Sequence, residues 1–271
     1  MKRTTLSGLL MSILIMLVLV VQPSFKVQAL PVSVYDAVVD PLPYNMPSLG
    51  FQATSTSEFG DFIHLAGTNR ILQSVTVTMS TWARNSEYPA MPSTGFTHPI
   101  TINIYNAVPG APLNTVGALL ATVTATKTIP WRPEGDPTCP DTGYGAGFAW
   151  RAADTNCYNG MAFNLSFDMS SLNVTLPDDV IVGVAYNTQS HGAAPLGVPG
   201  PYNSLNVAVQ AGPAALGTDD NLDRVFANST WAGFYTDGGL AGLGIFREDT
   251  GWTGVGTVAL RIAANPPPPP V

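Results

Sequence analysis

Basic residues are scarce in this chain of 271 residues, and histidine and cysteine are scarcer still. Eleven Lys and Arg residues accompany eighteen Asp and Glu residues, with three His and two Cys, so the net charge is −7. Without residues 1–29, which are interpreted below as a cleaved segment, eight basic residues remain, Lys127 is the one lysine and the net charge is −10. Nucleic acids and anionic membranes are bound by basic patches. The sequence therefore predicts neither partner.

Catalytic and metal-binding signatures are also missing. His64, His98 and His191 are scattered and form no H-x-x-x-H pattern, and there is no G-x-S-x-G motif. The four glutamates lie far apart, and no spacing selects a pair of carboxylates for glycoside hydrolysis. We identify no catalytic residue. Because triads and carboxylate pairs assemble in space, a secreted hydrolase acting on polysaccharide remains the alternative function.

Helical periodicity is absent as well, since apolar residues nowhere recur at spacings of three and four over three turns. Gly and Pro number 26 and 24 and fall between segments that alternate apolar and polar residues. The pattern predicts an all-β fold, an antiparallel β-sandwich of jelly-roll-like type with about ten strands and long loops. The expected strands cover residues 32–39, 59–65, 72–82, 98–105, 119–126, 161–168, 180–186, 205–209, 224–227, 233–236 and 258–262.

The two ends of the chain suggest an exported protein. Lys2 and Arg3 precede an apolar run over residues 9–21, and Ala29 is a small residue at a suitable cleavage point. Thirteen apolar residues are short for a membrane span, which takes roughly 20. We therefore predict a signal peptide over residues 1–29, a β-sandwich domain over 30–264 and a proline-rich tail or linker over 265–271. The mature chain is expected to be secreted or at the cell surface, without membrane insertion.

The two cysteines are predicted to form a disulfide. An exported protein meets an oxidising environment in which Cys139 and Cys157 should pair. Closing a loop of about 19 residues contributes about 3 kcal/mol in the chain-entropy description. A metal site or a reactive thiol is the alternative, but no histidine lies near either cysteine in the sequence.

One acidic segment resembles the start of a calcium-binding loop. Asp219, Asn221 and Asp223 have the D-x-N-x-D spacing of the first three ligands. Arg224 stands where the turn glycine should be and Thr230 where the bidentate glutamate is expected, so an EF-hand is excluded. The candidate cofactor is calcium in an irregular loop site. The alternative, a solvated acidic turn, is favoured by the broken motif.

Several aromatic residues fall in or beside the expected loops rather than within the alternating strands. Exposed rings beside Asn and Asp side chains are typical of sugar-binding surfaces, where the ring stacks on a pyranose face. The alternative is that each ring closes the end of the sandwich under its own loop. The candidate stacking residues are Trp131, Trp150, Tyr158, Trp231 and Trp252.

Two segments carry a family resemblance. Residues 67–82, GTNRILQSVTVTMSTW, and residues 172–183, LNVTLPDDVIVG, resemble segments of an uncharacterised family of exported bacterial β-sandwich surface proteins. Members of that family are often joined to proline-rich spacers or anchoring signals. The resemblance implies secretion and a sandwich fold. It transfers no functional residue, because the shared motifs are strand patterns.

Together these observations favour a secreted or cell-surface, non-catalytic β-sandwich module. Its expected partner is a carbohydrate or another cell-surface component, and calcium is a candidate stabiliser. The alternative is the polysaccharide-acting hydrolase, and a second alternative is a purely structural surface or spacer domain. An exposed aromatic platform would favour binding, and two carboxyl groups roughly 5 to 9 Å apart in a cleft would favour hydrolysis.

Overall fold

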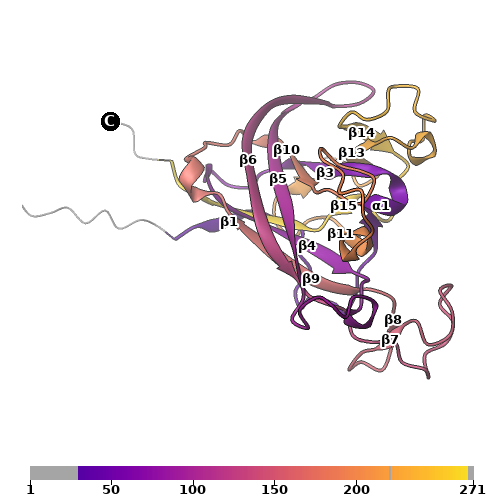
Figure 1. Cartoon of the computed structure of the whole chain (residues 1–271). Coiled ribbons are helices and arrows are strands. Elements are labelled where there is room, and N and C mark those ends of the chain that lie inside the picture. Colours follow the sequence, from indigo (N-terminus) through magenta and orange to yellow (C-terminus); the bar gives the residue numbers. More distant parts are fainter. Residues whose placement is uncertain (1–29, 220, 268–271) are drawn as a thin grey trace, which may run out of the picture.

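The computed structural model describes residues 30–219 and 221–267 (Figure 1). The predicted signal peptide over residues 1–29 and the last four residues of the tail lie outside this described part. Within it, sixteen strands account for most of the regular structure. No helix of the described residues is long and apolar enough to cross a membrane.

The first sheet has seven antiparallel strands. Its main order is β1 (Val32–Asp36), β16 (Leu260–Asn265), β4 (Ile71–Thr81), β11 (Leu205–Gln210) and β15 (Thr257–Val258). The remaining strands, β2 (Ser48–Gly50) and β9 (Met161–Asp168), pair with β11 and β4.

The second sheet also has seven antiparallel strands. Its order is β14 (Arg247–Thr250), β13 (Arg224–Ser229), β3 (Thr56–His64), β10 (Asp179–Ala185), β5 (Phe96–Val108) and β6 (Thr115–Ile129), and β12 (Thr218–Asp219) pairs with β3. The helices are single turns: α1 (Phe51–Thr54), η1 (Asn85–Glu87), η2 (Ser170–Leu172), η3 (Pro201–Ser204) and η4 (Ala232–Phe234). The predicted antiparallel all-β sandwich is confirmed.

The core between the two sheets is built from the apolar residues that alternate with polar residues along the expected strands. Val75, Val77 and Met79 of β4 are fully buried in the same cluster as Ile102 of β5 and Val182 of β10. Alternation explains this arrangement because every second side chain of a strand points to the same face. β10 is buried on its other face too, where Ile181 is fully buried.

That other face carries a second, smaller cluster on the outside of the second sheet. Phe62, Ile181 and Phe226 are buried there, and Tyr105 and Phe246 pack against them. This cluster runs across the sheet from β13 to β6, and Phe246, next to β14, packs against it. The rest of that face is left for polar residues.

One predicted strand, over residues 233–236, is wrong. Residues 232–234 form the single turn η4, which folds back over β13. The Tyr235 hydroxyl accepts a hydrogen bond from the Ser229 amide at 2.9 Å and donates one to the Ala227 carbonyl at 3.0 Å. Arg247 lies 3.7 Å over the Tyr235 ring. Residues 232–236 are therefore held by side-chain contacts and not by the backbone hydrogen bonds of a strand.

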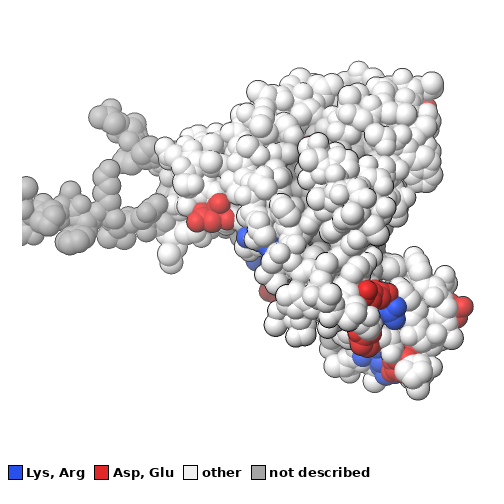
Figure 2. All heavy atoms as spheres, in the orientation of Figure 1, with Lys and Arg blue, Asp and Glu red and all other residues white. Residues whose placement is uncertain are grey.

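A lobe over residues 130–160 projects from the sandwich and contains the hairpin β7 (Trp150–Arg151) and β8 (Cys157–Tyr158) (Figure 1). The predicted disulfide between Cys139 and Cys157 is confirmed. Buried Arg132 donates to the carbonyls of Trp82, Pro133 and Phe148. In the view of Figure 2, most charged side chains gather on and beside this lobe.

Candidate functional site

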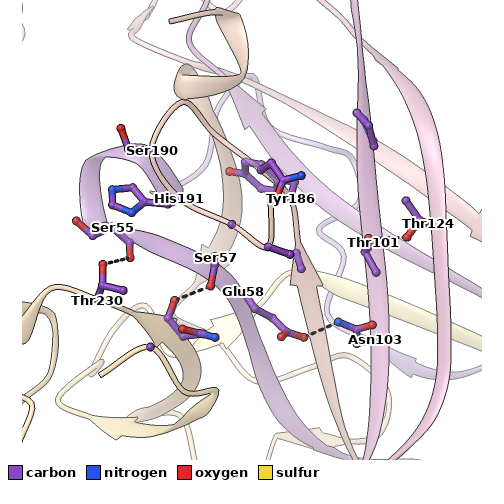
Figure 3. Close-up of a pocket in the computed structure, with 17 residues that line it drawn as sticks. Ser55, Ser57, Glu58, Thr101, Asn103, Thr124, Tyr186, Ser190, His191 and Thr230 are labelled. Carbon is purple, nitrogen blue, oxygen red and sulfur yellow. Dashed lines mark hydrogen bonds between the residues drawn. The ribbon is translucent and has the colours of Figure 1, made fainter. Parts of the chain in front are cut away.

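A pocket of about 670 Å³ opens on the outer face of the second sheet (Figure 3). Strands β3, β5, β6 and β10 contribute to its lining. The loop after β10, over residues 186–193, forms one wall. The pocket therefore combines a rigid floor of paired strands with a loop side.

Strand register places the pocket residues in one row. Asn228 of β13 is paired with Glu58 of β3, and Glu58 is paired with Ala185 of β10. Ala185 is paired with Thr101 of β5, which is paired with Thr124 of β6. All five face outward because the residues between them in each strand face the core. The row crosses five strands and is polar except at Ala185.

One of two paired glycines makes room for the glutamate. Gly60 of β3 is paired with Gly183 of β10, two residues along each strand from the pair of Glu58 and Ala185. A Cβ atom on Gly183 would lie 2.2 Å from the Glu58 carboxyl oxygen Oε1, which is too close for any contact. The glutamate side chain therefore lies over the bare backbone of Gly183.

The Glu58 carboxyl group is fixed by two donors. Its Oε1 accepts a hydrogen bond from Asn103 Nδ2 at 2.8 Å and one from the Tyr105 hydroxyl at 3.0 Å, and neither bond uses Oε2. Only 9% of the residue is exposed. Burial raises the pKa of Glu58, and the two hydrogen bonds oppose that rise in pKa. Glu58 is the only carboxylate among the described lining residues, and no Lys or Arg lines the pocket with it.

Further hydrogen bonds orient the polar groups around Glu58. Thr122 donates to Asn103 Oδ1 at 2.7 Å, which fixes which end of the Asn103 amide faces the glutamate. The hydroxyls of Thr101 and Thr124 lie 2.7 Å apart. Such a network holds donors and acceptors in place before a ligand arrives.

The loop wall is tied to the sandwich by its own hydrogen bonds. The Ser190 amide donates to Gln52 Oε1 of α1 at 3.2 Å. The Ala194 amide donates to Asn187 Oδ1 at 3.1 Å, and the Thr188 amide donates to the His191 carbonyl at 2.8 Å. The polar groups of residues 190 and 191 are thereby held at the mouth of the pocket (Figure 3).

The five candidate stacking residues are not brought together, and none lines this pocket. Trp150 is buried and packs with Tyr158 at 6.0 Å between ring centres, in the lobe. Trp131 stacks on Tyr88. Trp252 packs on Phe59 and donates its Nε1 hydrogen to Asp249. Trp231 is the most exposed of the five, at 51%.

The acidic segment forms a pair of hydrogen-bonded turns. Asp219 Oδ1 accepts from the Asn221 amide and Asn221 Oδ1 accepts from the Asp223 amide, both at 3.0 Å. Asp219 Oδ2 and Asp223 Oδ1 accept from the hydroxyls of Thr257 and Thr253. Among the described residues, no group of three or more His, Cys, Asp or Glu side chains is placed to hold a metal ion. Calcium binding by this segment stays a prediction.

Comparison with known proteins gives no match among family models, curated proteins or solved structures. Support for a function therefore comes from the geometry of the pocket.

The central residue of this pocket, Glu58, was not singled out by the sequence. The alternation of Thr101, Asn103 and Tyr105 with isoleucines did indicate a polar outer face on β5. What the pattern did not contain is the pairing of Gly60 with Gly183, because strand order is a property of the fold.

Proposed function

We propose that this protein is a secreted or cell-surface, non-catalytic module that binds a neutral carbohydrate in the pocket around Glu58. The observation that supports the proposal is the fixed row of carboxylate, amide and hydroxyl groups across the second sheet. A rigid sheet that carries a few convergent polar groups is a common form of small-molecule site.

The chemistry of the lining residues matches sugar hydroxyl groups. A hydroxyl both donates and accepts hydrogen bonds, and this pocket offers acceptors on Glu58, both functions on Asn103 and Asn228, and hydroxyls on Thr101 and Thr124. A sugar acid would place its own carboxylate near Glu58 with no Lys or Arg in the lining to offset the repulsion. The ligand class is therefore an uncharged sugar.

Binding is favoured over hydrolysis by the count of carboxyl groups. Glycoside hydrolysis by the common mechanisms uses two carboxyl groups on either side of the scissile bond. The described residues that line this pocket supply one, Glu58.

Export is proposed on two observations, and a third concerns the partner. The sequence of residues 1–29 has the layout of a signal peptide. The disulfide between Cys139 and Cys157 is of the kind that persists in oxidising compartments. The acidic balance argues against nucleic acid as a partner.

The test is calorimetric titration of the mature protein, residues 30–271, with neutral oligosaccharides of glucose, mannose, xylose and N-acetylglucosamine, each one to six units long. We expect at least one series to bind. Glu58→Gln and Thr101→Val should each weaken that binding about tenfold, because the first replaces an acceptor oxygen by an N–H donor and the second removes a hydroxyl group.

A matched control lies on the other sheet. Thr76 and Ser166 form a hydroxyl pair at 2.8 Å, comparable with that of Thr101 and Thr124. Thr76→Val should leave the affinity unchanged. Absence of binding across the whole panel, or equal losses for Thr76→Val and Thr101→Val, would overturn the proposal.

A further inference from the structure

A second pocket, of about 440 Å³, lies beside the first and has a different character. Its lining is mainly apolar and comes from two long loops, residues 83–95 and 186–204, together with the beginning of β5. Besides Pro99, the apolar lining residues are Met91, Pro92, Phe96, Leu196, Pro201 and Tyr202.

The two pockets are neighbours that share part of their lining. Both are lined by Pro99 and Asn187. Along the outer face of β5, Thr97 and Pro99 line the second pocket, and Pro99, Thr101 and Asn103 line the first. With a rise of about 3.3 Å per residue, the segment from residue 97 to residue 103 spans roughly 20 Å. We call the two neighbouring pockets together the trough, which is polar at one end and apolar at the other.

The apolar end is held in a defined shape. His98 stacks on Tyr202 with ring centres 5.2 Å apart and an angle of 17° between the rings. His98 Nε2 also lies 2.8 Å from the Asn187 carbonyl oxygen. On the opposite side, Trp131 donates its Nε1 hydrogen to the Pro92 carbonyl at 2.8 Å. Both loops are therefore anchored to residues beneath them.

We infer that the trough binds one linear oligosaccharide, with one sugar in the polar pocket around Glu58 and a later ring packed by its C–H face in the apolar pocket beside Tyr202. This inference rests on the proposed carbohydrate binding and adds the size of the ligand and a second subsite. Sugar rings have an apolar face that packs on aromatic and aliphatic side chains, which suits the lining of the second pocket. In this inference the aromatic ring that packs on the sugar is Tyr202, which is not among the five candidate stacking residues of the sequence analysis.

The experiment measures the affinity of the mature protein for single sugars and for two- to six-unit oligosaccharides of the series that binds. In the wild-type protein, affinity should rise with length until both pockets are filled. Tyr202→Ala should lower the affinity for the longer chains about tenfold, as expected for loss of a packed aromatic ring, and leave the single sugar within about twofold.

Three further variants control for local unfolding. Tyr202→Phe keeps the ring and should keep the dependence on length. Leu196→Ser changes the exposed rim of the same pocket without touching the His98 stack, and should reproduce the loss for long chains. Tyr144→Ala, an exposed aromatic of the lobe, should change nothing.

The outcomes separate the two proposals. If sugars bind but affinity does not depend on length, or Tyr202→Ala and Leu196→Ser weaken single sugars and long chains equally, the two-subsite inference is overturned and the binding module stands. If no sugar of the panel binds, both are overturned.

Discussion

At the scale of single residues, Glu58 combines features that ordinary surface glutamates lack. It is buried, its carboxyl group is fixed by Asn103 and Tyr105, and its side chain lies over a glycine. Burial of an acid favours its neutral form and so raises its pKa.

We predict that Glu58 makes the folded state less stable as the pH rises. Below the ordinary pKa of 4.5, both folded and unfolded states hold the proton. As the pH rises from that value towards the raised pKa, the unfolded state releases its proton first, so the free energy of unfolding falls until the folded state also ionises. Glu58→Gln has no proton to release and should remove this part of the fall.

The measurement is urea unfolding of the wild-type protein and Glu58→Gln between pH 4 and pH 8. The difference between the two curves isolates Glu58 from the other carboxyl groups. A difference that is constant across this range of pH would contradict the predicted direction of the pKa.

At the scale of strands and loops, the alternating pattern was sufficient to predict most of the sandwich. Ile100, Ile102 and Ile104 do face the core, and the intervening polar residues do face outward. The pattern was not sufficient for the pocket, because strand order and register bring Glu58, Asn103 and Asn228 together from distant parts of the chain. Short-range signals contain no such information.

Aromatic residues show the same limit. Proximity to loops in the sequence suggested exposed rings, yet Trp150 is buried in the lobe and Trp252 packs on Phe59. Burial of a large ring at the base of a loop removes apolar area from water. This gain in stability determines where the ring lies more than the polar composition of the flanking sequence does. Tyr202, which does line a pocket, has no distinguishing local pattern.

We predict that Gly183→Ala removes carbohydrate binding by displacing Glu58. The new methyl group would lie 2.2 Å from Oε1, so the carboxyl group must leave its place beside Asn103 and Tyr105. Calorimetric titration should show at least a tenfold loss of affinity, with a decrease of about 1–3 kcal/mol in the free energy of unfolding from overpacking. Gly212→Ala is the matched control, since no atom lies within 4 Å of its new Cβ. Unchanged binding in Gly183→Ala would contradict the assigned position of Glu58.

The disulfide should stabilise the lobe more than the sandwich. The lobe has one short hairpin, in which β7 and β8 pair over two residues each. Replacing Cys139 and Cys157 by serine removes a cross-link worth about 3 kcal/mol in the chain-entropy description. We expect faster amide hydrogen exchange across residues 133–160 and unchanged exchange in β4, β5 and β10, measured by mass spectrometry. Equal acceleration in the lobe and in those strands would contradict this separation.

At the scale of the whole molecule, the effect of calcium on stability distinguishes a calcium-binding loop from a solvated acidic turn in the acidic segment. The carboxylate oxygens of Asp219 and Asp223 already accept hydrogen bonds from Asn221, Thr257 and Thr253. If the segment is a solvated acidic turn, as these hydrogen bonds favour, the thermal midpoint of the mature protein should be the same with calcium and with a chelator. An ion that binds only the folded state would raise the midpoint. A clear rise with calcium, abolished by Asp223→Ala, would restore the calcium loop.

The proposed function makes the outer face of the second sheet the binding face of this molecule. It is tested most directly by two-dimensional NMR of the mature protein, titrated with the oligosaccharide that binds most tightly. We predict that shifted amide signals are confined to β3, β5, β6, β10, β13 and the loops over residues 83–95 and 186–204. Shifts centred on Trp231, on the lobe or on the outer face of β4 and β9 would contradict the account.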